Sequence, residues 1–256
     1  MQTFLVMVVG TVTGALGGLF GKGGSAIATP MLAAVGVRSF AAVASPLPAT
    51  IPATLVAAYA YWRAGEIDRR VLSTVIWVGV PATIVGALVS SAIGGSALVL
   101  ICDLIVAALG VRILAHRAPA PAPALVPVGG PGPGEAEPRN QSVVAVAVIV
   151  GLASGLLANS GGFLLAPLFV TTLRLPFKKA LGTSLAAAAA LAVPGTIVHA
   201  ALGHIDWSVA VPFGLASVPL SAFGAHLALR TDASRLETIY GAVLIVFGLG
   251  LLLIRL

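Results

Sequence analysis

The sequence has very few charged side chains and almost no cysteine. Only 9% of its 256 residues are Asp, Glu, Lys or Arg, whereas soluble globular domains carry about 25%. That shortage excludes an ordinary water-soluble domain. The single cysteine, Cys102, lies in an apolar segment, so a disulfide framework and a CxxC metal site are both excluded. We expect no bound metal and no cofactor.

Long apolar runs dominate what the sequence does contain. Hydrophobic residues make up 59% of the chain, and its mean hydropathy is +1.08. Several runs of about 20 apolar residues are long enough to cross a hydrocarbon core of ~30 Å as helices. The sequence therefore predicts an all-α, polytopic helical membrane protein that has the lipid bilayer as a partner.

The excess of positive charge has a simple explanation in such a protein. The net charge of +6 and the pI near 10.3 would suit nucleic acid, but the Lys and Arg residues collect in short loops, as the positive-inside bias predicts. We expect no nucleic-acid partner. The N-terminus has no basic region and no small-residue cleavage signal, so we interpret its apolar run as a first membrane segment.

The two halves of the chain are related by an internal repeat. A shift of 138 positions superposes Gly65, Ile67 and Asp68 on Gly203, Ile205 and Asp206. Residues 117–141 are a linker rich in Pro, Gly and Ala, a composition that favours extended chain without a packed core. We predict one membrane domain, with repeat 1 at 1–116 and repeat 2 at 142–256. A shift of 137 positions superposes the earlier part of each repeat, matching Gly14, Gly18, Leu19, Gly24 and Pro30 with Gly151, Gly155, Leu156, Gly161 and Pro167.

Each repeat is expected to contain a helical hairpin followed by three crossings. The second segment of each hairpin has about 12 residues and spans only ~18 Å, so the hairpin enters and leaves on the same side. Three crossings then place the second repeat upside down relative to the first. The predicted segments are Phe4–Phe20, Ser25–Gly36, Phe40–Trp62, Val71–Ile93, Ser96–Ala115, Val143–Leu157, Phe163–Leu173, Lys179–Leu202, Trp207–Leu229 and Leu236–Leu256.

The distribution of Lys and Arg supports these inverted repeats. With both termini outside and the linker in the cytoplasm, only Arg38 and Arg255 lie outside, and Lys22 lies at a hairpin tip. If each broken segment were one full crossing, the cations would divide almost evenly. The cytoplasmic set is Arg63, Arg69, Arg70, Arg112, Arg117, Arg139, Arg174, Lys178, Lys179, Arg230 and Arg235.

A glycine-rich break lies at the tip of each predicted hairpin. Irregular backbone at membrane depth is tolerated where it is buried in protein or lines a cavity, and a break repeated in both halves indicates a binding site. The short helices that follow point unpaired N–H groups and a partial positive charge inward, which favours an anion. We predict substrate contacts from Lys22, Gly23, Gly24 and Ser25 at one tip and from Asn159, Ser160, Gly161 and Gly162 at the other. In the alternative, Lys22 extends to the membrane interface and the glycines only allow close helix packing.

The third segment of each repeat carries a second polar break, at Ser45 in one copy and at Thr183 and Ser184 in the other. These hydroxyls are predicted to coordinate the oxygens of a ligand. The alternative, which stays open, is that they bond their own helices. Asp68 and Asp206 directly precede helical runs, so we predict that they are helix N-caps and not catalytic acids.

Two further residues are candidates to carry a coupling proton. Asp103 is the only acid in the interior of a membrane segment, where it either transfers a proton or bonds a neighbouring helix. His199 lies near the end of a segment and has a side chain that titrates near neutral pH. Its alternative role is that of an ordinary interfacial histidine.

Several motifs, in the same order in both halves, resemble the sulfite exporter (TauE/SafE) family of TSUP transporters. They are Gly18-Leu19-Phe20-Gly21-Lys22-Gly23-Gly24 with Pro30, Gly155-Leu156-Leu157 with Gly161-Gly162 and Pro167, Lys179-Ala180-Leu181-Gly182-Thr183-Ser184-Leu185, and Gly203-His204-Ile205-Asp206. The resemblance covers nearly the whole chain apart from the linker. It implies a secondary transporter of small sulfur-containing anions such as sulfite, sulfoacetate or thiosulfate, and other organic anions are also substrates within the family.

We therefore predict an alternating-access anion transporter in the bacterial cytoplasmic (inner) membrane, and we consider a homodimer. One alternative is a passive anion channel, which the sequence does not distinguish from a carrier. The other is an intramembrane enzyme, for which the chain offers no HExxH, no GxSxG and no clustered acids within its segments.

Overall fold

The structure is a computed structural model that describes residues 1–21, 23–101, 104, 140–158, 162–236, 239 and 242. Every regular element in these ranges is helical. The helices are α1 (Gln2–Leu19), α2 (Gly23–Ala34), α3 (Ser39–Ala44), α4 (Pro46–Arg63), α5 (Arg69–Thr74), the π-helical turn η1 (Val75–Gly79), α6 (Val80–Ile93), α8 (Asn140–Leu156), α9 (Gly162–Thr171), α10 (Phe177–Ala201) and α11 (Trp207–Arg230).

Five stretches of helix are long and apolar enough to cross a membrane: Gln2–Leu19, Ser39–Arg63, Arg69–Ile93, Phe177–Ala201 and Trp207–Arg230. At 1.5 Å per residue, the 24 residues of α11 extend about 36 Å, which exceeds a hydrocarbon core of ~30 Å. The protein is therefore an all-α, multi-pass membrane protein, as predicted. Most of the predicted segments Ser96–Ala115 and Leu236–Leu256 lies outside the described residues.

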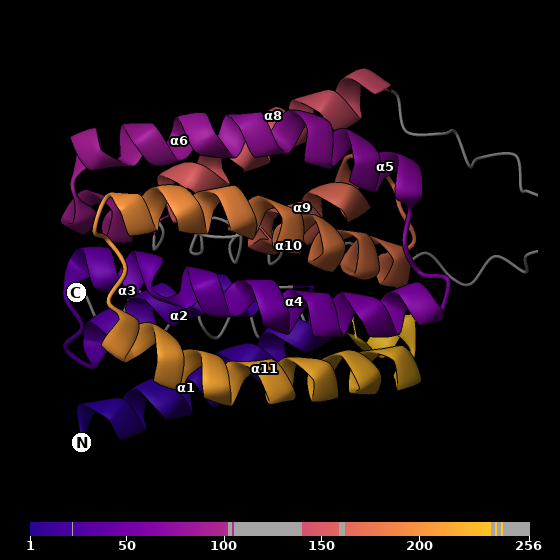
Figure 1. Cartoon of the computed structure of the whole chain (residues 1–256). Coiled ribbons are helices and arrows are strands. Elements are labelled where there is room, and N and C mark those ends of the chain that lie inside the picture. The colour runs from indigo at the N-terminus through magenta and orange to yellow at the C-terminus, as the bar shows by residue number, and fades with distance from the viewer. Residues whose placement is uncertain are drawn as a thin grey trace, which may run out of the picture.

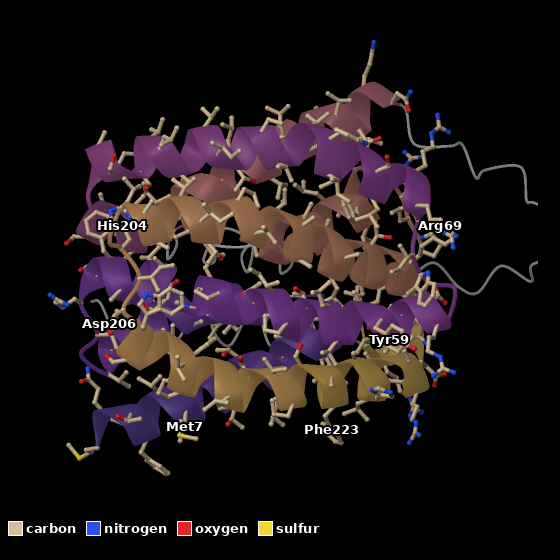
Figure 2. The ribbon with its side chains drawn as sticks, viewed as in Figure 1. Met7, Tyr59, Arg69, His204, Asp206 and Phe223 are labelled. Carbon is tan, nitrogen blue, oxygen red and sulfur yellow. The ribbon has the colours of Figure 1, made fainter. Side chains whose placement is uncertain are left out.

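The long helices run side by side, and their ends gather at the two ends of the bundle (Figure 1). Arg69 lies at one end and Asp206 at the other (Figure 2), and we name the two ends after these residues. At the Arg69 end, the Arg70 guanidinium donates to Oδ1 of Asn140 at the start of α8 (3.1 Å). At the same end, Lys178 Nζ donates to the carbonyl oxygen of Leu229 in α11 (3.0 Å).

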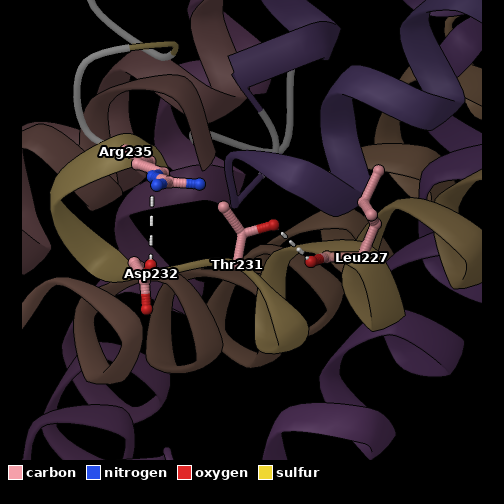
Figure 3. Close-up of polar contacts among 4 residues, drawn as sticks. All are labelled: Leu227, Thr231, Asp232 and Arg235. Carbon is pink, nitrogen blue, oxygen red and sulfur yellow. Dashed lines mark hydrogen bonds and ion pairs between the residues drawn. The ribbon is translucent and has the colours of Figure 1, made fainter.

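Positive charge is concentrated at the Arg69 end among the described residues. Helix α11 ends there, where Thr231 Oγ1 donates to the carbonyl oxygen of Leu227 (2.8 Å) (Figure 3). Just beyond it, Arg235 Nε lies 3.9 Å from Asp232 Oδ2. That ion pair is almost fully exposed and contributes little to stability. The cations of this end are Arg63, Arg69, Arg70, Arg174, Lys178, Lys179, Arg230 and Arg235, whereas Arg38 lies at the Asp206 end.

The closest helix crossings join one repeat to the other. Helix α1 packs along α11, and α8 packs along η1 and α6. A Cβ atom on Gly18 would overlap the carbonyl oxygen of Ser221, and one on Gly155 would overlap that of Thr83. The four positions form equivalent pairs, because Thr83 and Ser221 are separated by the repeat shift of 138. Small residues let helix backbones approach closely within a membrane, so these repeated glycines serve packing.

Glycines of the partner helices α6 and α11 also allow close approach of the backbones. A Cβ atom on Gly86 of α6 would overlap the carbonyl oxygen of Leu152 in α8, and one on Gly224 of α11 would overlap that of Ala15 in α1. Glycines on both partners therefore bring each pair of backbones together. The internal repeat of the sequence thus appears in the structure as two equivalent helix pairs.

The second polar break is present in the first repeat and absent from the second. Ser45 separates α3 from α4, and Pro46 begins α4 where a missing N–H group does no harm. In contrast, α10 continues without interruption through Gly182, Thr183 and Ser184. The predicted break there is wrong, because Gly182 has a packing role: a Cβ atom would overlap the Glu66 carbonyl oxygen.

Candidate functional site

Both hairpins turn through a residue in the left-handed backbone region. Gly21 follows α1 with φ +64°, and Ala158, its equivalent in repeat 2, follows α8 with φ +44°. A residue with a Cβ atom rarely adopts this conformation, and holding it there costs about 1–3 kcal/mol. Ala158 is also buried. Strain of this kind clusters at ligand sites and switch regions, so the second break is a functional candidate on geometry alone.

The residues after each break begin a short helix. Gly23, Gly24 and Ser25 form the first turn of α2, and Gly162 is the first residue of α9. The first four N–H groups of a helix have no partner within it. Helices α2 and α9 contact each other, so two such helices meet inside the bundle. Five other predicted site residues lie outside the described residues: Lys22, Asp103, Asn159, Ser160 and Gly161.

Ser184 lies beside the first break, as a site residue should. Its Oγ donates to the carbonyl oxygen of Leu181 in its own helix (2.8 Å) and to that of Gly21 (3.2 Å). A residue of repeat 2 is thus in contact with the break of repeat 1. At the second break, Ala158 shares an apolar cluster with Leu47 of α4, a residue of repeat 1.

Ser45 and Thr183 make reciprocal contacts between the repeats. The amide of Asp206 donates to Ser45 Oγ (3.0 Å), and the amide of Asp68 donates to Thr183 Oγ1 (2.9 Å). Each hydroxyl is fully buried and accepts a hydrogen bond from the loop of the other repeat, a contact that neither predicted role included. Because both act as acceptors here, each still has a hydroxyl hydrogen to donate.

The two aspartates cap helices, as predicted. Asp68 Oδ1 accepts from the amides of Arg70 and Val71, each at 3.0 Å. Asp206 Oδ1 accepts from the amide of Ser208 (3.0 Å) and from its hydroxyl (2.6 Å). Hydrogen bonding from Ser208, with a contribution from Arg38, lowers the pKa of the Asp206 carboxyl.

His199 is fully buried and is not an exposed interfacial residue. Its Nε2 lies 2.8 Å from the carbonyl oxygen of Gly155, in the last turn of α8. Its Nδ1 lies 3.0 Å from Nδ1 of His204. The His204 ring stacks on Phe40, with the ring centroids 4.2 Å apart.

The contact between His204 and His199 was not predicted from the sequence. The two are five residues apart across the end of α10, where the amide of His204 donates to the His199 carbonyl oxygen (3.0 Å). This 6→1 bond is a common way to end a helix and brings positions i and i+5 together. The spacing of the two histidines at a predicted helix end was therefore the available signal.

Tyr61 was also not identified, although it holds the position of His199 in repeat 1. Its side chain is fully buried, and its hydroxyl has no hydrogen-bond partner among the described residues. It belongs to an apolar cluster with Phe20, at the first break, and Leu181. A buried polar group usually has a partner, so this hydroxyl is a candidate ligand contact.

A hollow of about 680 Å³ opens at the Asp206 end. His204 and Asp206 contribute to its wall, and Figure 2 shows both residues at this end of the bundle. Partial burial lowers the pKa of the His204 imidazole. The hollow lies between segments of both repeats, and the other polar side chains that line it are Arg38, Ser39 and Ser96.

Comparison with known proteins shows the family. Residues 6–251 match the family model described as Sulfite exporter TauE/SafE. The chain belongs to the TauE/SafE family. A probable membrane transporter protein of Xylella fastidiosa (strain 9a5c) is 29% identical over 257 residues, covering 96% of this chain and 93% of that protein. In Bacillus subtilis (strain 168), the probable membrane transporter protein YjnA is 25% identical, covering 96% of this chain and 98% of its own length. No solved structure matches the chain.

The TauE/SafE family predicted from the repeated motifs is thus confirmed, and the protein is a membrane transporter of this family. In this TauE/SafE protein, three buried side chains lie beside the helices that end at the two breaks. Ser184 and Tyr61 are associated with the first break, and His199 with the helix that leads into the second.

Proposed function

We propose that this protein is a secondary transporter that moves small sulfur-containing anions, such as sulfite or sulfoacetate, across the bacterial inner membrane by alternating access. The anion binds between the two glycine breaks. The contact between α2 and α9 is the observation that supports this site most, because these are the two short helices that follow the breaks. Helix starts of this kind favour anions through unpaired N–H groups and a partial positive charge.

The proposed binding residues fall into two groups. Backbone N–H groups of Gly23–Ser25 and Ser160–Gly162, together with Lys22 and Asn159, hold the anion directly. Buried hydroxyls supply further hydrogen bonds: Ser45 and Thr183 each retain a hydrogen, and the Tyr61 hydroxyl has no partner among the described residues. Hydroxyl and amide donors suit the oxygen atoms of a sulfonate or sulfite group.

The orientation in the membrane follows from charge. Eight described cations lie at the Arg69 end, namely Arg63, Arg69, Arg70, Arg174, Lys178, Lys179, Arg230 and Arg235. Lys and Arg are enriched on the cytoplasmic side of membrane proteins, so we assign that end to the cytoplasm. The Asp206 end, with its hollow, then faces the outside, and the two repeats have opposite orientations.

A binding measurement on Lys22 variants tests the proposed site. Lys22→Met removes one positive charge and nearly preserves side-chain volume. Because a hydrogen bond to a charged group contributes about 1.5–3 kcal/mol, affinity should fall by about ten- to a hundredfold. Lys22→Arg should recover part of the loss. The dissociation constants are measured by ligand-induced stabilisation of purified protein with sulfite, thiosulfate, sulfoacetate, sulfate and acetate.

Arg230→Met is the control, because it removes one positive charge from the exposed last turn of α11 at the Arg69 end. It should bind the anion as the parent does. Equal dissociation constants for the parent and folded Lys22→Met would remove Lys22 from the site. Binding of acetate in preference to every sulfur-containing anion would contradict the proposed substrate class.

A further inference from the structure

The contacts of His199 fix where its hydrogen atoms lie when the pair is neutral. A carbonyl oxygen only accepts hydrogen bonds, so Nε2 of His199 carries a hydrogen and donates it to Gly155 (2.8 Å). In neutral imidazole the other nitrogen is then bare. Because the two Nδ1 atoms are 3.0 Å apart, His204 must donate its Nδ1 hydrogen to His199. Nε2 of His204 is left as the only nitrogen of the pair that is free to accept a proton.

We propose that His204 and His199 form a proton-binding pair that takes up a proton from the hollow at the Asp206 end and strengthens anion binding at the second break. This inference rests on the proposed anion transport. Uptake forms a bond between the proton and Nε2 of His204. The Nδ1–H bond of His204 then breaks as the same hydrogen bonds to Nδ1 of His199. One proton enters, and its positive charge moves from His204 to the buried His199.

Burial opposes a positive charge on His199, whereas its contact with α8 favours one. Its Nε2 contacts the Gly155 carbonyl oxygen in the last turn of α8, where the helix dipole presents a partial negative charge. Gly155 lies three residues before the strained Ala158, at the break where the anion is proposed to bind. A cation here attracts an anion to the second break, and the bound anion in turn holds the proton, since binding linkage is reciprocal.

The surroundings give the pair access to protons from the Asp206 end. His204 lines the hollow there, whereas His199 behind it is fully buried. Among the described residues, the charged groups that line the same hollow are Arg38 and Asp206, and their charges are opposite. Phe40, stacked on His204, carries no charge. Burial lowers the pKa of His204, so it gains its proton below the ordinary histidine pKa of about 6.5.

The first repeat has no such pair. Tyr61 and Glu66 hold the positions of His199 and His204, and the backbone bond is the same, with the Glu66 amide donating to the Tyr61 carbonyl oxygen (2.9 Å). A tyrosine has an ordinary pKa of about 10 and does not exchange protons near neutral pH. Proton uptake through a histidine pair is therefore a property of the Asp206 end alone.

The pH dependence of anion binding tests the inference. Dissociation constants are measured between pH 5 and pH 8 for the parent, His204→Gln and His199→Gln, using sulfoacetate, thiosulfate and sulfate as probes. The parent should bind about tenfold more tightly at pH 5.5 than at pH 7.5, because one proton is taken up with the anion. Both variants should change less than twofold. His226→Gln is the control, because His226 is exposed on α11 and contacts only its own helix, at the Ala222 carbonyl oxygen.

Histidine ¹⁵N NMR resonances of the parent provide a second readout that needs no substrate. The rings of His199 and His204 should titrate as a coupled pair, and each single variant should shift the titration of the remaining ring. If His204→Gln does not fold, His204→Phe keeps the stacking on Phe40 while removing both nitrogens.

Independent titration of the two rings, or pH-independent anion affinity in the parent, would overturn the proton pair. If no anion binds at any pH, the proposed function fails, while the NMR titration still decides whether the pair shares a proton.

Discussion

Individual glycines in this protein have roles that their sequence pattern does not reveal. Gly14, Gly18, Gly151 and Gly155 were recognised as a repeat, and the repeat was interpreted through the breaks that follow it. In the structure these four residues bring helix backbones together. Sequence periodicity shows that a small residue is required, but it does not identify the helix that packs against it. Van der Waals packing needs only a close fit, so no particular residue type marks the partner helix.

A glycine substitution distinguishes packing from local helix propensity. Gly18→Ala should lower the free energy of unfolding by about 1–3 kcal/mol, because the new Cβ atom overlaps the Ser221 carbonyl oxygen and α1 must move away from α11. Helix propensity alone predicts the opposite sign, since alanine stabilises a helix by about 1 kcal/mol relative to glycine. Thermal unfolding in detergent measures the difference.

Gly195→Ala is the matched control within a helix. Its Cβ atom would meet the flexible end of Leu47 at 3.1 Å, a side chain that can move. This variant should be at least as stable as the parent. If Gly18→Ala were equally stable, the close crossing of α1 and α11 would be refuted.

At the scale of the helices, each repeat holds a loop of the other through one hydroxyl. The sequence predicted the N-caps Asp68 and Asp206 correctly, because capping depends on local order along the chain. It did not predict that Thr183 and Ser45 accept hydrogen bonds from the amides of these same residues, since the two partners of each bond are more than 100 positions apart. The break predicted within α10 was wrong for a related reason. Gly182 allows the Glu66 carbonyl oxygen to approach α10 closely, and it does not interrupt the helix.

Thr183→Val tests the contribution of one such hydroxyl. The substitution keeps the shape of the side chain and removes the acceptor for the Asp68 amide, so the free energy of unfolding should fall by about 0.5–1.5 kcal/mol. Thr183→Ser should retain most of the parent stability. Thr11→Val is the control, because the Thr11 hydroxyl is exposed and bonds only the Met7 carbonyl oxygen of its own helix. Chemical denaturation midpoints that are the same for Thr183→Val and the parent would show that this bond adds nothing.

At the scale of the whole molecule, the sequence predicted more of the architecture than of the site. Charge, apolar length and the internal repeat predicted most helices, and the resemblance of the motifs in both halves indicated the family. They did not identify the His199–His204 contact or the unpaired hydroxyl of Tyr61, since both depend on how helix ends and apolar clusters pack in three dimensions. Lys22 and Asn159, on which the anion prediction depends most, lie outside the described residues, so their roles remain predictions.

The inverted arrangement of the repeats is tested by two equivalent positions. Ala64 and Leu202 are separated by the repeat shift of 138, cap α4 and α10 with nearly identical backbone angles, and are exposed at opposite ends of the bundle. In a Cys102→Ala background, an impermeant thiol reagent should label Leu202→Cys in intact cells. Ala64→Cys should be labelled only after the membrane is permeabilised. Labelling of both from outside would refute the inversion, and labelling of Ala64→Cys alone would reverse the assigned orientation.

Substrate counterflow in proteoliposomes tests the central claim most directly. Vesicles that contain the purified protein are loaded with an unlabelled anion, either sulfite, thiosulfate or sulfoacetate, and are diluted into a trace of the same anion labelled with ³⁵S. An alternating-access carrier exchanges internal for external anion, so the label should accumulate transiently above its equilibrium level and then decline. Protein-free vesicles should show no such overshoot. Entry of the label that only approaches equilibrium would identify a channel, and the absence of protein-dependent entry for all three anions would contradict the proposed transport function.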